Sequence, residues 1–358
     1  MNRILVNARF LVSPLTGVQR YAREMVNALH AVGKGRCDLV LAVPQGVSFD
    51  LCDDIQLFRD PSPLPGHLWE QMRLPAIMRK TNADLLWSPC GSGPLLVRKQ
   101  VVTVHDASVF ACRECFKWTY RTFHRTLLPL LAGRVRRLIT VSEFSKAELL
   151  SYKIGACEKI SVIYNGINAQ AFSDHNRKIP IDGERYVLSV GSRDPRKNVP
   201  RLLKAWEAIP ANLKRGLKLV IAGGSGSGFA REVLGDVPRD VVFLGYVAEQ
   251  DLASLYARAA IFVYPSIYEG FGFPPLEAMA CKTPVIVSNA ASLPEICGDA
   301  ALYCDPFNVE SIAEKIIELL DDPSMQEQLS GKGLERVKEF TWRKAATKLI
   351  QVFDGELN

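Results

Sequence analysis

Residues 261–288 read IFVYPSIYEGFGFPPLEAMACKTPVIVS, and this stretch decides the fold. Apolar runs at 261–266 and 284–288 predict β-strands, and the amphipathic segment 273–281 between them predicts a helix. Both runs are continuously apolar, which is typical of parallel strands buried on both faces. The stretch therefore predicts a strand–helix–strand unit of a parallel α/β sheet.

The same alternation continues on both sides of this unit. Further strands are expected at 186–191, 217–223 and 241–245, with an earlier set at 4–9, 38–43, 84–88, 101–105 and 138–142. Helices are expected at 199–209, 249–259, 308–322 and 324–338. Two strand sets with helices between them predict an α/β chain of two Rossmann-like domains with doubly wound sheets.

The length of 358 residues suits two domains. Residues 168–184 are polar and show neither the two-residue period of a strand nor the 3.6-residue period of a helix, so we expect a linker there. This places an N-terminal domain at 1–168 and a C-terminal domain at 185–338, facing each other across a cleft. We expect residues 339–358 to form a last helix that packs back on the N-terminal domain.

Composition excludes wholesale disorder, because 48% of the residues are apolar and 23% are charged. Residues 1–170 carry 22 basic and 13 acidic side chains, whereas the remainder carries 22 and 25. The basic half indicates an anionic partner such as phosphate or an acidic membrane surface, and an uneven solvated surface is the alternative. No motif typical of nucleic-acid readers is present, so we expect no nucleic-acid partner.

Targeting and redox signals are weak. No apolar run approaches the roughly 20 residues that span a bilayer, and the start MNRILVNARF does not resemble a signal peptide. The nine scattered cysteines predict reduced thiols and a cytoplasmic location. Cys112 and Cys115 form the one C-x-x-C, and without a second pair we expect no zinc site or other metal site.

The motif SIYEGFGFPPLE, 266–277, has the features of a site for a phosphorylated sugar. Gly270 and Gly272 leave backbone N–H groups open to a ligand, and the proline pair suits the first turn of a helix, whose N-terminus attracts anions. Glu269 and Glu277 can accept hydrogen bonds from hydroxyls of a sugar or ribose. Two carboxylates beside a phosphate site predict a sugar nucleotide as ligand.

Three further motifs follow predicted strands or open helices. VGSRDPRKN, 190–198, gathers cations at a turn before a helix, which suits a diphosphate, although a solvated basic loop is the alternative. TVHD, 103–106, places His105 at a strand end, where a side chain can reach a ligand. PLTGVQRY, 14–21, predicts a loop and a helix that begins near Gly17.

Together these motifs resemble glycosyltransferase family 4, the retaining enzymes of GT-B fold, over nearly the whole chain. The E-G-F-G-x-P-x-L-E block is the most specific part. It is supported by R-K-N at 196–198, V-S-E-F-S at 141–145, Y-N-G-I at 164–167 and S-L-P-E at 292–295. The R-K-N form resembles the subgroup that builds bacterial surface polysaccharides, often mannosyltransferases.

The resemblance implies a role for each motif. Glu269 would contact donor-sugar hydroxyls, and Glu277 would hold the ribose. Arg196 and Lys197 would bind the diphosphate, and His105 would lie near the transferred sugar. The remaining contacts to the donor would come from Gly17, from the amides of Gly270, Phe271 and Gly272, and from the backbone around Gly245 and Tyr246 near the base.

The resemblance also implies a reaction. A nucleotide sugar, with GDP-mannose the first choice, would donate a hexose with retention to a glycan or lipid-linked acceptor in surface polysaccharide synthesis. The leaving phosphate would take the acceptor proton, so that no cofactor, metal or protein base is required. A sugar-nucleotide epimerase of GT-B-like fold and a non-catalytic scaffold of the same fold remain alternatives.

Two positions depart from the family pattern. Ser192 stands where many relatives have arginine, and Arg193 would take its place. Lys282 stands where many relatives have glycine, so it would be slightly strained if that turn requires a positive φ. The glycine-rich stretch 223–228 lacks the lysine of a P-loop and is expected to be a flexible turn.

Two other segments leave alternatives open. Segment 113–137 has seven basic residues and one acidic residue, and its apolar stripe would face either an anionic membrane surface, on the inner face of the membrane, or the protein core. That stripe consists of Phe116, Tyr120, Phe123, Leu127 and Leu131, beside Lys117, Arg121 and Arg125. Trp69, Glu70 and Gln71 open a helix and would serve acceptor contact or core packing.

Overall fold

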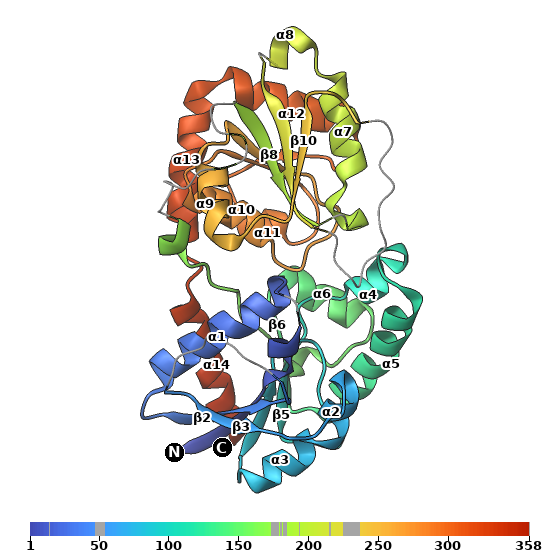
Figure 1. The fold of residues 1–358 in the computed structure, drawn as a ribbon, viewed down its shortest axis with the longest axis vertical. Helices are drawn as coiled ribbons and strands as arrows, with labels where there is room; N and C mark the ends of the chain where they lie inside the picture. Colours follow the sequence, from blue (N-terminus) through green and yellow to red (C-terminus); the bar gives the residue numbers. More distant parts are fainter. Residues whose placement is uncertain are drawn as a thin grey trace. The chain divides into compact units, whose positions relative to one another are not determined.

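The computed structural model describes residues 1–13, 15–46, 54–172, 179, 181, 185–192, 194–214, 216–224 and 237–357. The chain divides into two compact units, each built on one sheet (Figure 1). The first unit comprises Met1–Phe110, Thr122–Gly166 and Thr341–Asn358, and the second comprises Ala111–Arg121 and Ile167–Phe340. The last helix thus belongs to the first unit, whereas residues 111–121, which the sequence analysis assigned to the N-terminal domain, belong to the second.

The first unit contains a seven-stranded parallel sheet in the order β3-β2-β1-β4-β5-β6-β7. Its strands are β1 (Asn2–Asn7), β2 (Cys37–Val43), β3 (Gln56–Arg59), β4 (Leu85–Ser88), β5 (Gln100–Thr103), β6 (Arg137–Thr140) and β7 (Ile160–Val162). The α-helices are α1 (Gly17–Gly33), α2 (Gly66–Met72), α3 (Leu74–Lys80), α4 (Ser108–Ala111), α5 (Trp118–Arg134), α6 (Glu143–Ser151) and α14 (Trp342–Leu357), with α4 and α5 crossing the unit boundary. Short 3-10 helices lie at η1 (Ala8–Val12) and η3 (Cys157–Lys159).

The second unit contains a six-stranded parallel sheet in the order β10-β9-β8-β11-β12-β13. Its strands are β8 (Tyr186–Val190), β9 (Lys218–Ala222), β10 (Val241–Gly245), β11 (Ile261–Tyr264), β12 (Val285–Ser288) and β13 (Leu302–Cys304). The α-helices are α7 (Val199–Ala208), α8 (Ala211–Lys214), α9 (Glu249–Ala257), α10 (Phe273–Ala280), α11 (Leu293–Cys297), α12 (Val309–Asp321) and α13 (Pro323–Val337). The 3-10 helices are η2 (Arg113–Cys115), η4 (Ala169–Phe172) and η5 (Pro195–Lys197).

Both sheets reverse their strand order once, between β1 and β4 and between β8 and β11. This confirms the predicted pair of doubly wound sheets. All ten predicted strands are present, but β3, β7 and β13 were not predicted. These three lie at sheet edges and are only partly buried, so they lack the continuous apolar run that marked the predicted strands.

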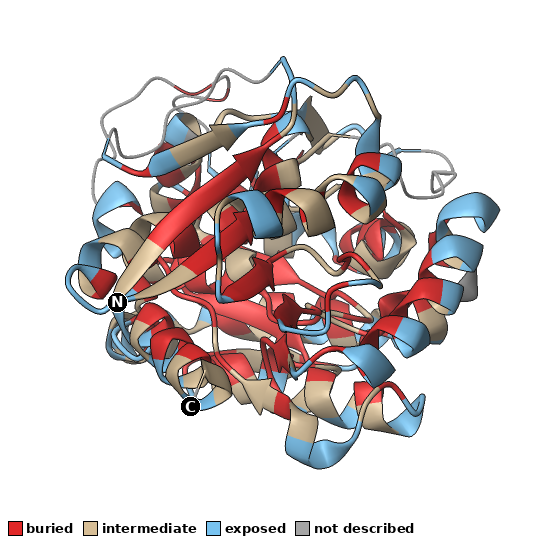
Figure 2. Cartoon of the chain, turned by 90° about the horizontal axis from the view of Figure 1, so that it is seen from below, coloured by how far each residue is buried: buried red, intermediate tan, exposed pale blue. Residues whose placement is uncertain are grey.

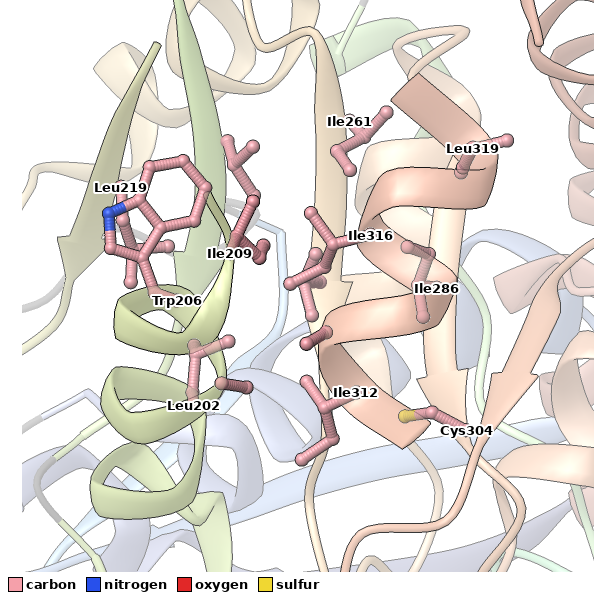
Figure 3. Close-up of a cluster of buried hydrophobic side chains, with 14 of the residues drawn as sticks. Leu202, Trp206, Ile209, Leu219, Ile261, Ile286, Cys304, Ile312, Ile316 and Leu319 are labelled. Atoms are coloured by element: carbon pink, nitrogen blue, oxygen red, sulfur yellow. The ribbon is translucent and has the colours of Figure 1, made fainter. Parts of the chain in front are cut away.

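Most strands are buried, the edge strands β3 and β10 less so, and the helices carry both buried and exposed residues (Figure 2). In the second unit, Leu202 and Trp206 of α7 and Ile316 of α12 pack on Leu219 and Ile261 of the sheet (Figure 3). In the first unit, Trp69 and Leu74 belong to a cluster with Leu5 and Leu86 of the neighbouring strands β1 and β4. Each sheet thus has its own apolar core.

The start of the terminal helix α14 packs closely against the backbone of Gly166 in the first unit. A β-carbon at Gly166 would lie only 2.1 Å from the backbone nitrogen of Trp342, the first residue of α14. The helix also packs along α1, and the Trp342 ring lies 6.0 Å from the Tyr21 ring. The glycine of Y-N-G-I therefore makes room for the start of α14.

We expect Gly166→Ala to lower stability, because the new methyl group meets backbone that cannot rotate away. The cost should be about 1–3 kcal/mol, as for other overpacked sites, and thermal unfolding measures it. Gly133→Ala in α5 is the control, since a β-carbon there meets nothing within 4 Å and alanine suits a helix better. An equally stable Gly166→Ala variant would contradict this packing.

Candidate functional site

The switch point of the second sheet brings two predicted motifs together. β8 and β11 are neighbours, and the sheet continues from them in opposite directions. In such sheets, ligands bind beyond the carboxyl ends of the strands at this point. The motif 190–198 begins at the last residue of β8, and residues 266–277 follow β11. The two motifs that the sequence analysis selected therefore meet where the fold favours a ligand.

Lys197 and Glu269 form an ion pair at this point. Nζ of Lys197 lies 2.6 Å from Oε1 of Glu269, and the side chains are only 17% and 13% exposed. The stem of Lys197 passes over Gly191, where a β-carbon would come within 3.1 Å of it. The glycine that follows β8 therefore allows Lys197 to reach the loop after β11.

The two oxygens of Glu269 have different surroundings. Oε1 accepts hydrogen bonds from Nζ of Lys197, from the Tyr264 phenol at 2.9 Å and from the Ser266 hydroxyl at 2.6 Å. Among the described residues, none donates to Oε2. Burial acts to raise the pKa of Glu269, but the charges of Lys197 and Arg196 and these hydrogen bonds outweigh it and hold the pKa below its ordinary value. Glu269 is therefore ionised and has one open oxygen.

Arg196 is held by Asp194. Its Nη2 lies 2.6 Å from Oδ2 of Asp194, which is buried, and its Nε lies 3.0 Å from the same oxygen. The guanidinium also lies over the Phe116 ring, 5.2 Å from its centre. Of the two expected diphosphate ligands, Lys197 thus points at Glu269, and Arg196 is bound within its own loop.

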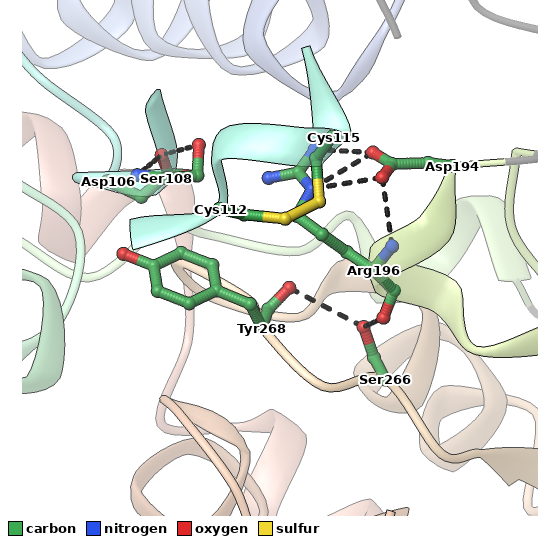
Figure 4. Close-up of a disulfide and its surroundings, with 8 residues drawn as sticks. All are labelled: Asp106, Ser108, Cys112, Cys115, Asp194, Arg196, Ser266 and Tyr268. Atoms are coloured by element: carbon green, nitrogen blue, oxygen red, sulfur yellow. Dashed lines mark hydrogen bonds and ion pairs between the residues drawn. A yellow bond between two sulfur atoms is a disulfide. The ribbon is translucent and has the colours of Figure 1, made fainter. Parts of the chain in front are cut away.

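Cys112 and Cys115 form a disulfide next to the Asp194–Arg196 pair (Figure 4). The expectation that all cysteines are reduced is therefore wrong for this pair. η2 packs against η5, which brings the two Cα atoms within 5.5 Å, a normal separation for a disulfide. The described free cysteines are Cys37, Cys90, Cys157, Cys281, Cys297 and Cys304.

Asn198 ties the loop after β8 to the loop after β11. Its backbone has a positive φ of 62°, and its side-chain amide donates to the carbonyl oxygens of Pro265 at 3.0 Å and Pro306 at 2.6 Å. The amide of Ile267 donates to the carbonyl of Arg196 at 2.8 Å, which adds a second link. The asparagine of R-K-N thus fixes the loop that carries Lys197.

The backbone of the E-G-F-G segment is held by the side chain of Ser292. Its hydroxyl lies 3.0 Å from the carbonyl oxygen of Glu269 and 2.9 Å from that of Phe271. The Phe271 ring is buried against Phe273 and Phe340, so only its backbone can face a ligand. Gly272 has a φ of 106°, and α10 begins at Phe273 with the proline pair in its first turn, as predicted.

Glu277 lies inside α10 and is 3% exposed. The buried Tyr256 phenol donates to its Oε2 at 2.8 Å. At the end of β10, Gly245 has a φ of 68°, and Tyr246 is 75% exposed. Arg193 lies outside the described residues, as do 225–228 of the glycine-rich stretch and 173–178, 180 and 182–184 of the expected linker.

Lys282 has a φ of 62°, so the predicted strained turn is present. A residue with a side chain pays a cost in this conformation that glycine avoids. The turn follows the C-terminal end of α10, and Lys197 and Glu269 are not part of it.

In the first unit, His105 follows β5 by two residues. Its Nε2 lies 2.9 Å from the carbonyl oxygen of Pro89 and must carry the proton, since a carbonyl only accepts. Burial lowers the pKa of His105, so the ring is neutral and its Nδ1 is an acceptor. Tyr21 of α1 packs edge-on against the ring at 4.6 Å. α1 begins at Gly17, as predicted.

Trp69, Glu70 and Gln71 join α2 to loops at the carboxyl end of the first sheet, and the first two are fully buried. Trp69 donates to Asp60, Glu70 accepts from Asn7, Arg9 and Ser92, and Gln71 binds the backbone of Gly93 and Leu95. Of the two alternatives, the structure favours core packing for this motif.

The stripe on segment 113–137 is divided between core and surface. Phe116, Leu127 and Leu131 are buried, whereas Tyr120 and Phe123 are 42% and 38% exposed. Among the described helices, none is both long enough and apolar enough to cross a membrane.

Sequence reasoning assigned no role to Asp194, Tyr256, Tyr264 and Ser266, although Asp194 and Ser266 lie inside the motifs 190–198 and 266–277. Tyr264 and Ser266 end β11 and begin its loop, and that position was the one available signal. Asp194 stands two residues before its partner Arg196 inside the motif 190–198, so its signal was local, whereas Tyr256 carries none because its partner Glu277 is 21 residues away.

We expect Asn198→Gly to lower stability by about 1–3 kcal/mol, because two buried carbonyl oxygens lose their donor. Asn198→Ala should cost about 1 kcal/mol more, since alanine disfavours the positive φ. Thermal unfolding measures both. Asn82→Gly, at a turn with a φ of 49°, is the control and should be close to wild type. A fully stable Asn198→Gly would show that the two loops hold together without it.

Comparison with known proteins agrees with the two-unit architecture. Residues 172–336 match the family model described as glycosyl transferases group 1, and residues 15–171 match the model described as glycosyltransferase family 4. The chain is 30% identical to the O-antigen chain mannosyltransferase B of Escherichia coli, over 95% of this chain and 96% of that protein.

Two further similarities support this result. The O-antigen chain mannosyltransferase RfbU of Salmonella typhimurium strain LT2 is 33% identical over 71% of this chain and 70% of its own. The solved structure of a sucrose-phosphate synthase from Thermosynechococcus elongatus aligns with a TM-score of 0.77 at 21% identity, covering 99% of both chains. The structural likeness shows the GT-B fold.

Proposed function

Because the chain belongs to glycosyltransferase family 4, we propose that it transfers mannose from GDP-mannose, with retention, to a glycan or lipid-linked acceptor in surface polysaccharide synthesis. The observation that carries the proposal is the Lys197–Glu269 pair at the switch point of the second sheet. Mannose is favoured because two relatives are O-antigen chain mannosyltransferases by name and because the R-K-N form resembles that subgroup.

Lys197 suits a diphosphate leaving group. Its ammonium has three protons, two of which are donated to Tyr264 and Glu269, so that one remains for a phosphate oxygen. As the bond between the sugar C1 and the phosphate oxygen breaks, negative charge grows on the diphosphate, and a fixed cation stabilises it. Arg196 adds positive potential to the same loop while it stays paired with Asp194.

Glu269 suits a sugar hydroxyl. Its open Oε2 can accept from the donor sugar, and the low pKa keeps it ionised at neutral pH. In the proposed reaction the acceptor oxygen attacks C1 on the face that the phosphate leaves, and its proton passes to that phosphate. No metal or protein base is needed in this scheme. Glu277 and the backbone at Gly245 and Tyr246 would hold the nucleoside.

The donor assignment is tested with purified protein and a panel of GDP-, UDP-, ADP- and dTDP-sugars, without added metal. We expect GDP-mannose alone to raise the melting temperature and to give an α-mannosylated product with a lipid-linked acceptor. Selective transfer from another nucleotide sugar would replace the donor. Epimer formation without acceptor would favour the epimerase, and binding with no turnover would favour the scaffold.

Lys197→Ala should lower kcat by about 100-fold or more, as for other losses of a group that stabilises developing charge. Lys332→Ala is the matched control, because Lys332 pairs with Asp299 on the surface, and it should leave kcat unchanged. An active Lys197→Ala enzyme would rule out the diphosphate role of this lysine.

We further propose that the first unit contacts an anionic membrane surface. α2, the loop before β5 and α5 expose large apolar side chains, and the His67 and Phe123 rings lie 4.3 Å apart, which joins α2 to α5. These side chains are Leu68, Met72, Leu96, Phe123 and Leu130. Exposed Arg98, Lys99 and Arg134 accompany them. Apolar side chains with cations are typical of interfacial binding to acidic lipids.

Vesicle flotation tests this contact. We expect binding to vesicles with 30% phosphatidylglycerol, about tenfold weaker binding to pure phosphatidylcholine, and loss of binding at high salt. Leu96→Ser with Leu130→Ser should weaken binding, whereas Phe307→Ser, which removes an equally exposed side chain from the second unit, should not. Equal binding to neutral vesicles would exclude an electrostatic contact.

A further inference from the structure

We propose that Tyr264 and Ser266 are positioning residues for sugar transfer: they hold one oxygen of Glu269 so that the other faces the donor sugar. The inference deepens the proposed function and rests on it. Neither residue belongs to the E-G-F-G block, and both act through Glu269.

The geometry converges on one atom. Tyr264 is the last residue of β11, and Ser266 lies two positions later, so both reach toward the loop that carries Glu269. Their hydroxyl oxygens lie 2.9 and 2.6 Å from Oε1 of Glu269, and Nζ of Lys197 lies 2.6 Å from the same atom. Tyr264 is 1% exposed and Ser266 is fully buried. Water therefore does not replace these donors easily.

The available protons assign the direction of each bond. Burial, and then the charge of Glu269, raise the pKa of Tyr264 well above its ordinary value, so the phenol keeps its proton. It donates this proton to Glu269 and accepts from Lys197 through a lone pair. The single proton of Ser266 lies between Oε1 of Glu269 and the Arg196 carbonyl at 2.8 Å, and the carboxylate is the stronger acceptor.

These hydrogen bonds restrict the most easily rotated side-chain torsion of Glu269, χ3. The last torsion of the side chain has a broad, roughly two-fold profile, so an untethered carboxylate swings easily. Three donors on Oε1 fix that torsion and leave Oε2 in one place. A sugar hydroxyl that donates to Oε2 then meets an acceptor already in position, which is the condition for efficient orientation of the reacting carbon.

A double-mutant cycle tests whether both residues act through Glu269. We expect Tyr264→Phe and Ser266→Ala each to lower kcat about tenfold or more, in line with small losses of alignment, and to change the Kd for GDP less than about threefold. In a Glu269→Ala background, the same substitutions should change the residual rate less than about twofold, because nothing remains to be positioned.

The pH dependence of kcat gives a second readout that does not need the weak Glu269→Ala enzyme. Burial raises the pKa of Glu269, and Lys197, Arg196 and the Ser266 hydrogen bond lower it. Loss of the Ser266 hydroxyl therefore raises that pKa, and the acidic limb of the kcat profile should move to higher pH in Ser266→Ala. A merely structural role would leave the limb in place.

Tyr186→Phe is the matched control. Its buried phenol lies on the neighbouring strand and donates to the Leu255 carbonyl at 2.7 Å, away from Glu269. It should lower the melting temperature and leave kcat within about twofold. If Tyr264→Phe and Ser266→Ala match this control, or lose the same factor with and without Glu269, the inference is overturned. A wild-type chain that transfers no sugar overturns the proposed function itself, which is a different result.

Discussion

The ion pair between Lys197 and Glu269 is the interaction on which the arrangement of the neighbouring loops in the second unit depends. Both charges are mostly buried, and a buried pair contributes little to stability compared with apolar side chains of the same size. Losing one partner, however, leaves a buried charge and costs about 3–5 kcal/mol. The pair therefore needs support from its surroundings. Gly191 leaves space for the lysine stem, and Asn198 attaches its loop to the next one. Tyr264 and Ser266 donate hydrogen bonds to the carboxylate.

The same support explains why Arg196 and Lys197, adjacent in sequence, have different surroundings. Lys197 extends over a glycine to the next loop, while Arg196 is paired with Asp194 and covered by Phe116. The segment with the Cys112–Cys115 disulfide provides that cover, although most of the flanking chain belongs to the first unit. Of these two adjacent basic residues, Lys197 thus pairs with Glu269, and Arg196 stabilises its own loop.

Much of the site follows from pattern alone. In a parallel sheet, residues that follow adjacent strands meet at one edge, so the strand ends near 190 and 265 predict that the two motifs lie together. The proline pair, the glycines and Glu269 are recognised by their spacing. Tyr264 and Ser266 are not, because a tyrosine and a serine at a strand end are ordinary core or turn residues until their acceptor is known.

The sequence by itself determined the fold class, ten of the described strands and the place of the candidate site, because strand and helix periods and strand-end motifs are local properties. Only the tertiary structure decided which oxygen of Glu269 is held, that Asp194 binds Arg196, that residues 111–121 join the second unit, and that two cysteines pair. Residues 111–121 join the second unit through contacts between distant parts of the chain. The pairs Asp194–Arg196, Ser266–Glu269 and Cys112–Cys115, by contrast, lie two or three residues apart and depend on the exact loop conformation. A local pattern does not encode them, since the same spacing is compatible with several partners.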